Sequence, residues 1–254
     1  MKKVIVVTTF LMVLAVAPMA MADQVKLYRE TGYYTGSGGE FTVQIIGSGS
    51  PDLNWVLPLY DSKTKDIGNH DPSFQTFCIE KNEFVSIGTT YDFSISNRAY
   101  SGGVGTAGDP ISVGTAWLYH HFQNGDLKAA SLYDYTGSGR SADAGKLQNT
   151  IWWLEGEGGD PGSGNEFRQA VLAKFHNSYA EASSDNGGLY GHYSVAVLNL
   201  WAPGHVNDFS KDGNGNYMYL QQDQLVCVPE PASMLLLGSG LIGLAGFARR
   251  RFKK

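Results

Sequence analysis

Cysteine is nearly absent from this chain, since only Cys78 and Cys227 occur among its 254 residues. Two cysteines allow at most one intramolecular disulfide, so several bridges do not hold this fold together. Basic residues are also scarce away from the two ends. Seven of the 19 Lys and Arg lie at the termini, which leaves 12 basic against 24 acidic residues. Because nucleic acids bind cationic surfaces, this excess of acid argues against a nucleic-acid partner.

The usual signatures of catalysis and metal binding are missing as well. No Ser-His-Asp signature or phosphate-binding loop appears. His120 and His121 are adjacent, so they do not share a helix face as zinc ligands would. Residues 212–216 alternate oxygen-bearing side chains as a calcium loop does, but they lack the following glycine and the distal Glu, which favours a hairpin turn. The sequence predicts no metal, no cofactor and no enzyme turnover, and an exported hydrolase ranks third among the functions considered.

The N-terminus predicts a secretory signal peptide over residues 1–22. Lys2 and Lys3 precede an apolar run from residue 4 to residue 17, and Ala20-Met21-Ala22 provides a cleavage site with small residues. The apolar run is short for a membrane span, which favours a cleaved signal over a permanent anchor. The mature chain is therefore expected outside the cytoplasm.

The C-terminus carries three features in a fixed order: a Pro-Glu-Pro triplet, an uncharged run rich in glycine, and a cluster of arginines. They are Pro229, Glu230 and Pro231, then residues 232–248, then Arg249, Arg250 and Arg251. The uncharged run is near the lower limit of about 17 residues for a membrane helix. The basic cluster after it would stay on the cytoplasmic side.

This end, residues 229–254, resembles the PEP-CTERM sorting signal. The resemblance implies an exosortase-type protease that removes the span, in a Gram-negative bacterium that makes extracellular polysaccharide. It implies transient anchoring in the inner membrane and a final location at the cell surface or in the polysaccharide matrix.

Residues 23–228 remain as the ectodomain. Alternating apolar residues predict strands within 25–46, 74–80, 84–96, 193–201 and 217–228. Residues of about 109–183 have helical spacing, with Asp109 and Pro110 expected to open the first helix and 166–182 expected to form another. The pattern predicts an α+β fold, in which a sandwich- or barrel-like β domain carries an inserted helical block. A signal helix and a single transmembrane helix would flank it.

Cys78 and Gln148 are the candidate functional residues. Phe77 and Ile79 flank the cysteine in an apolar run that predicts a buried strand or its end. Gln148 lies beside the buried face of a predicted helix, four residues before Trp152. A glutamine in this position either hydrogen-bonds to backbone or water, or has lost its amide nitrogen to a cysteine sulfur and formed a thioester.

Two short motifs, Phe77-Cys78-Ile79 and 147–152 (Leu-Gln-Asn-Thr-Ile-Trp), together resemble the thioester domains of Gram-positive surface adhesins, in the same order. The resemblance implies a Cys78–Gln148 thioester supported by Phe77, Ile79, Ile151 and Trp152. An amine or hydroxyl on a surface or matrix partner would attack the Gln148 carbonyl, and the protein would become covalently attached. Single-use adhesion is the function that the resemblance implies.

Cys227 provides the main alternative. Two cysteines in an exported chain commonly form a disulfide, and Cys227 would reach Cys78 if the two strands pair nearby. The protein would then be a disulfide-stapled domain that binds matrix or polysaccharide without a covalent bond. The identity of the partner, the oligomeric state and the final anchoring stay open at this point.

Overall fold

The computed structural model describes residues 24–36, 38–46, 53, 55–100, 108–128, 131–189 and 191–229. The expected signal peptide, the span 232–248, Glu230, Pro231 and the three terminal arginines lie outside these residues. Within the described ranges, no helix combines the length and the apolar character that crossing a membrane requires.

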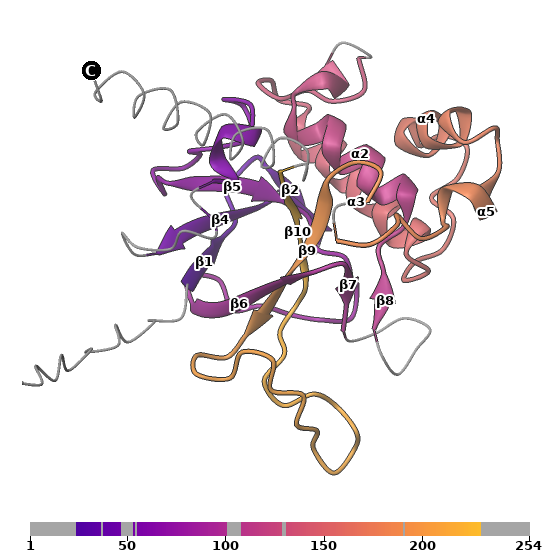
Figure 1. Ribbon diagram of the computed structural model, residues 1–254. Coiled ribbons are helices and arrows are strands. Elements are labelled where there is room, and N and C mark those ends of the chain that lie inside the picture. Colours follow the sequence, from indigo (N-terminus) through magenta and orange to yellow (C-terminus); the bar gives the residue numbers. More distant parts are fainter. Residues whose placement is uncertain are drawn as a thin grey trace, which may run out of the picture.

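An antiparallel six-stranded sheet forms the centre of the fold, in the order β10-β9-β6-β1-β4-β5 (Figure 1). Its strands are β1 (Gln24–Tyr28), β4 (Phe41–Ile46), β5 (Ser73–Thr76), β6 (Thr90–Ser96), β9 (Val195–Trp201) and β10 (Gln224–Cys227). In β1 the apolar residues Val25 and Leu27 are fully buried and their polar neighbours are half-buried, as the period of a strand requires. The central strand β9 is buried along its whole length.

The sheet curls until its two edges meet. The chain continues past β5, and Cys78 pairs with Gln224 of β10. Leu225 N donates to Phe77 O at 3.1 Å, and Thr76 Oγ1 donates to Leu225 O at 2.6 Å. The β part is therefore a curled half-barrel, which agrees with the barrel-like form of the predicted α+β fold.

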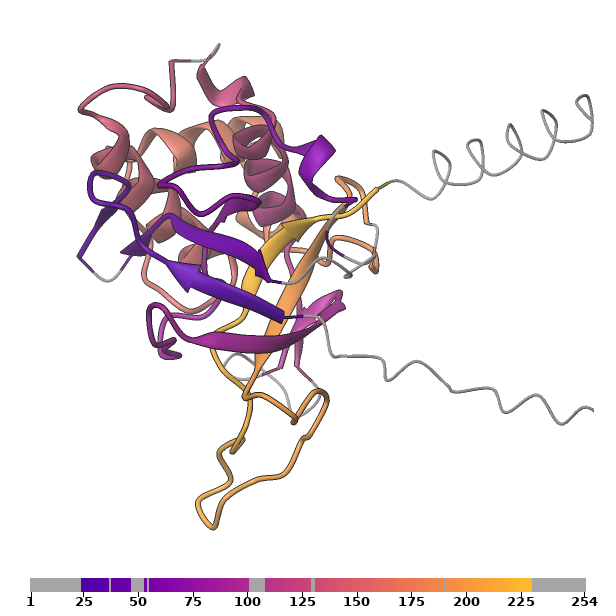
Figure 2. The same ribbon diagram turned by 90° about the vertical axis from the view of Figure 1, so that its left-hand side faces the viewer.

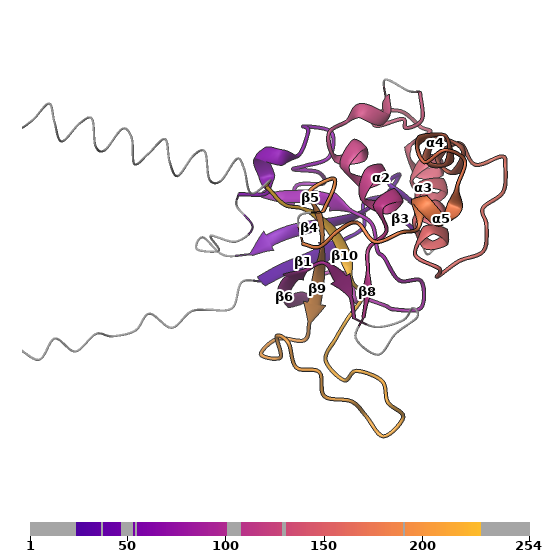
Figure 3. The same cartoon turned by 45° about the vertical axis from the view of Figure 1, so that its right-hand side comes forward.

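The α-helices follow one another along the chain between the short strand β8 (Asp109–Pro110) and β9. They are α2 (Val113–Gln123), α3 (Arg140–Leu154), α4 (Glu166–Lys174) and α5 (Tyr179–Ala182), with the 3-10 turn η2 (Asp126–Lys128) between α2 and α3. Another 3-10 turn, η1 (Leu57–Leu59), lies between β4 and β5. Two short ladders accompany them: β2 (Tyr34–Thr35) with β3 (Gly38–Gly39), and β7 (Arg98–Ala99) with β8 (Asp109–Pro110). The four α-helices gather on one side of the curled sheet (Figures 1 and 3). On another side, the segment between β9 and β10 projects away from it (Figure 2).

Three sequence predictions about the elements were wrong. Asp109 and Pro110 form β8, and the first helix is capped instead by Ser112, whose hydroxyl accepts from Thr115 N at 3.1 Å. The predicted helix 166–182 breaks in two, because His176 and Asn177 adopt the left-handed region at φ 52° and 60°. The expected strand 217–228 is shortened to β10.

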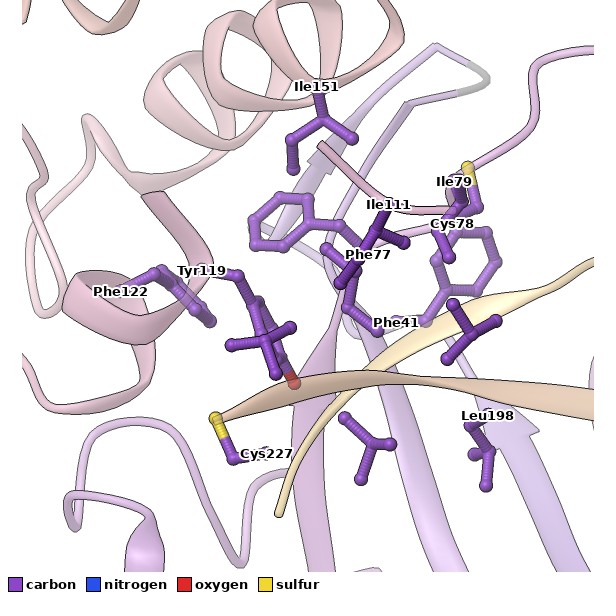
Figure 4. Packing of buried hydrophobic residues seen from close by; sticks show 14 of the residues in the cluster. Phe41, Phe77, Cys78, Ile79, Ile111, Tyr119, Phe122, Ile151, Leu198 and Cys227 are labelled. Carbon is purple, nitrogen blue, oxygen red and sulfur yellow. The ribbon is translucent and has the colours of Figure 1, made fainter. Parts of the chain in front are cut away.

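Most of the buried apolar residues form one core between the sheet and the helices. Figure 4 shows part of it, with Ile151 pointing from α3 toward the cluster that contains Phe77, Tyr119 and Phe122. Phe77 and Phe122 meet edge to face with ring centroids 4.9 Å apart. This core holds α2 and α3 against the strands, and so sets the position of every side chain on their inner faces.

A buried ion pair fixes the first turn of α3. Arg140 Nε donates to Glu40 Oε1 at 2.6 Å and its Nη2 donates to Glu40 Oε2 at 2.7 Å, in the bidentate arrangement that Arg favours. Tyr133 donates a further hydrogen bond to Glu40 Oε1 at 2.6 Å. Because both charged side chains are almost completely buried, the pair ties α3 to the residue between β3 and β4.

We expect Glu40→Gln to lower the free energy of unfolding by about 3–5 kcal/mol, because it leaves the buried Arg140 charge without its counter-charge. Glu166→Gln is the matched control, since Glu166 pairs with the half-exposed Lys146 and its loss should cost less than about 1 kcal/mol. Urea denaturation monitored by circular dichroism measures both. Equal losses in the two variants would contradict a special role for Glu40.

Candidate functional site

Cys78 lies two residues after the end of β5, where the backbone is held on the edge of the curled sheet. Ile79 N donates to Asp223 O at 3.0 Å and Phe77 O accepts from Leu225, so hydrogen bonds anchor both neighbours of the cysteine. The Cys78 side chain is fully buried. Because successive side chains of an extended segment point to opposite sides, Cys78 faces away from Phe77 and Ile79.

Gln148 lies on the inner face of α3 and is also fully buried. Its helix follows from the apolar spacing of Leu147, Ile151 and Leu154, and it ends before Gly156, whose φ of 78° suits a helix terminus. Leu147, Ile151 and Leu154 face the core, and Gln148 lies next to them on the helix.

Cys78 and Gln148 contact each other twice. The Cys78 thiol donates to Gln148 Oε1 at 3.3 Å, and Gln148 Nε2 donates to the Cys78 carbonyl oxygen at 2.7 Å. The carboxamide is thereby held with its oxygen at the sulfur and its nitrogen at the backbone of the same residue. Two residues that are 70 positions apart in the chain form a closed pair with no exposed surface.

Burial controls the chemistry of the sulfur. Removal from water raises the pKa of the Cys78 thiol to about 12, and the adjacent Trp152 indole and the positive charge of Arg29 offset this only in part. The group is therefore a neutral thiol at physiological pH. Such a buried thiol is protected from oxidants and alkylating reagents in the solvent.

The other predicted site residues surround the pair in different ways. Ile79 and Ile151 are buried, and Phe77 packs on Phe122 of α2. Trp152 is 5 % exposed and lies beside the sulfur. Cys78 and Gln148 are both fully buried, and Trp152 is the predicted site residue that neighbours the sulfur.

The short hairpin β2–β3 covers Gln148, and sequence reasoning missed it. A Cβ atom on Gly38 would lie 2.9 Å from Gln148 Cγ and 3.2 Å from Trp152 Cη2, so only glycine fits there. Arg29 holds the hairpin by donating to Gly38 O at 2.7 Å and to Gly36 O at 3.2 Å. The glycine run at 36–39 was the available signal, but by itself it indicates only a turn.

The second cysteine is not part of the site. Both cysteines are buried free thiols, and they lie on opposite sides of the cluster drawn in Figure 4. Cys78 stands opposite Gln224, and Cys227 lies three residues farther along β10, about 10 Å at the rise of a strand. A disulfide needs Cα atoms within roughly 7 Å. The Cys78–Cys227 disulfide of the alternative interpretation was therefore wrong for this fold.

A surface pocket of about 270 Å³ adjoins the site on the far side of Trp152. Its lining includes Lys81, Lys146, Asn149 and Asn165, together with Trp152 itself. Lys81 Nζ lies 5.8 Å from the centre of the Trp152 ring. Since Trp152 lines the pocket and also lies against the Cys78 sulfur, this one side chain divides the open pocket from the buried pair.

The segment 212–216 is the hairpin turn that the sequence analysis preferred. Asp212 Oδ1 accepts from Asn214 N at 2.8 Å and from Asn216 N at 2.9 Å. Lys211 and Tyr217 pair across the turn. The Asp212 carboxylate therefore organises its own backbone.

Comparison with known proteins assigns one part of the chain. Residues 228–251 match the PEP-CTERM protein-sorting motif, which confirms the predicted sorting signal and includes Pro229, Glu230, Pro231 and the three arginines. The motif identifies an exported protein that an exosortase-type protease processes at the membrane for display at the cell surface. No curated protein and no solved structure matches the chain.

We expect Gly38→Ala to displace Gln148 or Trp152 and to lower the free energy of unfolding by about 1–3 kcal/mol, because the new methyl group overpacks the site. The control is Gly159→Ala, where a Cβ would meet no atom within 4 Å and the change should stay within about 0.5 kcal/mol. Thermal and urea unfolding of the two variants measure the difference. A neutral Gly38→Ala would show that the hairpin does not pack tightly on Gln148.

Proposed function

We propose that Cys78 and Gln148 form an internal side-chain thioester, through which this exported protein couples covalently to a surface or matrix partner. The observation that carries the proposal is the double contact of 3.3 Å and 2.7 Å between the thiol, the carboxamide and the Cys78 carbonyl. In this arrangement the sulfur is next to the carbonyl group that it would attack. Proximity of this kind supplies a large part of the barrier reduction in intramolecular reactions.

Formation of the bond needs no further reagent. The Cys78 sulfur attacks Gln148 Cδ, the C–N bond breaks, and the nitrogen leaves as ammonia with the thiol proton. The products are a thioester and one ammonia, so atoms and charge balance. The full burial of both residues supports the proposal further, because an internal ester of this kind survives only where water is excluded.

In the coupling reaction the Cys78 sulfur is the leaving group, and Gln148 Cδ is again the atom that is attacked. An amine or hydroxyl of the partner attacks Gln148 Cδ, the C–S bond breaks, and the proton of the nucleophile ends on the Cys78 sulfur. The partner is then joined to Gln148 by an amide or an ester. The reaction happens once per chain, so the protein acts as an adhesin and not as an enzyme with turnover.

The pocket beside Trp152 is the proposed entry route for the nucleophile. Trp152 lines this pocket and also neighbours the Cys78 sulfur, so we expect rotation of its indole to connect the pocket with the pair. Lys81 at its wall favours a partner with negative charge close to the attacking group, whereas the charge of Lys146 is paired with Glu166. The sorting signal supports this function, because a protein displayed at the surface meets such partners there.

The decisive measurement is the intact mass of the full chain, purified from a host that exports it, before any reduction. We expect a deficit of one ammonia relative to the sequence after signal cleavage. Methylamine should add to Gln148 and release one thiol, which a maleimide then labels at Cys78. Tandem mass spectrometry locates both products.

Cys78→Ala should abolish the deficit and the methylamine adduct, whereas Cys227→Ala is the matched control and should retain both. A measured mass equal to that of the sequence, together with two free thiols, would refute the thioester. The protein would then be a noncovalent binding protein. A mass lower by two hydrogens would identify a disulfide and contradict the strand register as well.

We expect Trp152→Leu to accelerate methylamine coupling on the order of tenfold, equivalent to about 1.4 kcal/mol in the activation barrier, because the wall between pocket and thioester becomes thinner. Trp153→Leu is the control. Trp153 packs on Tyr179 in a tilted arrangement with centroids 4.7 Å apart and does not line the pocket. Similar rates in both variants would exclude the pocket as the route.

A further inference from the structure

Three carboxylates converge near the segment that carries Cys78. Glu80 and Glu83 follow the cysteine, and Asp223 lies just before β10. One oxygen from each residue lies within 4.8 Å of the other two. The backbone holds the group together, since Ile79 N donates to Asp223 O at 3.0 Å and Asp223 N donates to Glu83 Oε2 at 3.4 Å.

Two members of this cluster are buried and incompletely bonded. Asp223 is fully buried and Glu80 is 3 % exposed. Asp223 Oδ2 accepts from Tyr100 N at 2.8 Å, but Asp223 Oδ1 and Glu80 Oε2 have no hydrogen-bond partner among the residues that the structure describes. Buried polar atoms in native proteins nearly always have a partner.

No positive charge compensates these two carboxyl groups. In the described part of the chain, neither Glu80 nor Asp223 forms an ion pair with Lys, Arg or His. Elsewhere the same fold pairs its buried Glu40 with Arg140. Buried carboxyl groups in proteins are paired with a cation, protonated or bound to a metal, and the unpartnered oxygens of this cluster leave a place for a bound cation.

We propose that Glu80, Glu83 and Asp223 bind one Ca²⁺ ion. Two oxygens on opposite sides of a Ca²⁺ ion lie at most about 5 Å apart, because Ca–O distances are roughly 2.3–2.6 Å. The spacing within 4.8 Å therefore allows a single ion to contact all three carboxylates. Glu80 and Asp223 each carry one oxygen without a hydrogen-bond partner, which is free to bind the ion.

The donor set favours Ca²⁺ over other metals. All three side chains offer hard oxygen ligands, whereas zinc sites in proteins nearly always include Cys or His. Mg²⁺ demands a nearly ideal octahedron and keeps several waters, which suits a largely buried cluster poorly. Ca²⁺ accepts irregular carboxylate sets, and an exported protein meets it outside the cell.

The ion would join two parts of the chain that the curled sheet brings together. Glu80 and Glu83 belong to the segment after Cys78, and Asp223 leads into β10. A bound cation would strengthen this closure next to the cysteine. The site does not depend on the thioester, since no step of that chemistry uses these carboxylates.

The test uses the full chain, stripped with EDTA and dialysed, with CaCl₂ as the probe. We expect millimolar CaCl₂ to raise Tm on the order of 5 °C, and calorimetric titration to give one Ca²⁺ per chain. MgCl₂ at the same ionic strength should produce a clearly smaller shift. No shift with CaCl₂, or an equal shift with MgCl₂, would overturn the proposal.

Variants locate the ion. Asp223→Asn should abolish the Ca²⁺ shift while leaving Tm in EDTA equal or higher, because it removes one of the repelling charges. Glu83→Gln, at a partly exposed position, should also lose the shift and decides the question if Asp223→Asn does not fold. Asp212→Asn is the matched control at the oxygen-rich turn and should retain full binding.

Loss of the shift in Asp212→Asn, with retention in Glu83→Gln, would assign the ion to the turn 212–216 and refute the buried site. The result of the Ca²⁺ experiment is independent of the result of the thioester test. A chain that shows the ammonia deficit but no Ca²⁺ response, or the reverse, rejects one proposal and keeps the other.

Discussion

A buried carboxamide that has no water to bind must find its partners within the protein, and Gln148 finds both of them at Cys78. This requirement explains several features around it. The helix α3 must dock over the end of β5, and the cover above the amide must be thin, which leaves room only for glycine at position 38. The buried pair Glu40–Arg140 holds the start of the same helix in register with the sheet.

The buried carboxylates of this fold have two different kinds of environment. Glu40 has a bidentate Arg140 and a Tyr133 hydroxyl, so its charge is compensated and its role is structural. Glu80 and Asp223, by contrast, each have an oxygen without a hydrogen-bond partner in the described part of the chain. The contrast between them, within one fold, is the physical basis for assigning structure to one and ligand binding to the other.

Local patterns predicted the elements well where a strand or helix satisfies its own periodicity. Alternation in β1 and β6 and the helical spacing of Leu147 and Ile151 led to the correct element types. The prediction failed where a short stretch of sequence is compatible with more than one local structure. Asp109-Pro110 suits a helix start but pairs with β7, and the expected helix 166–182 is interrupted by residues in the left-handed region.

The sequence alone determined the sorting signal, because that signal is contiguous and depends on the order of residues and not on their spatial neighbours. It also singled out Cys78 and Gln148 as residues in need of an explanation. Only the tertiary structure decided that these two meet, that Cys227 lies too far along β10 to pair with Cys78, and that carboxylates about 140 positions apart converge. The reason is that such contacts depend on how the curled sheet closes, and that closure follows from the packing of the whole core.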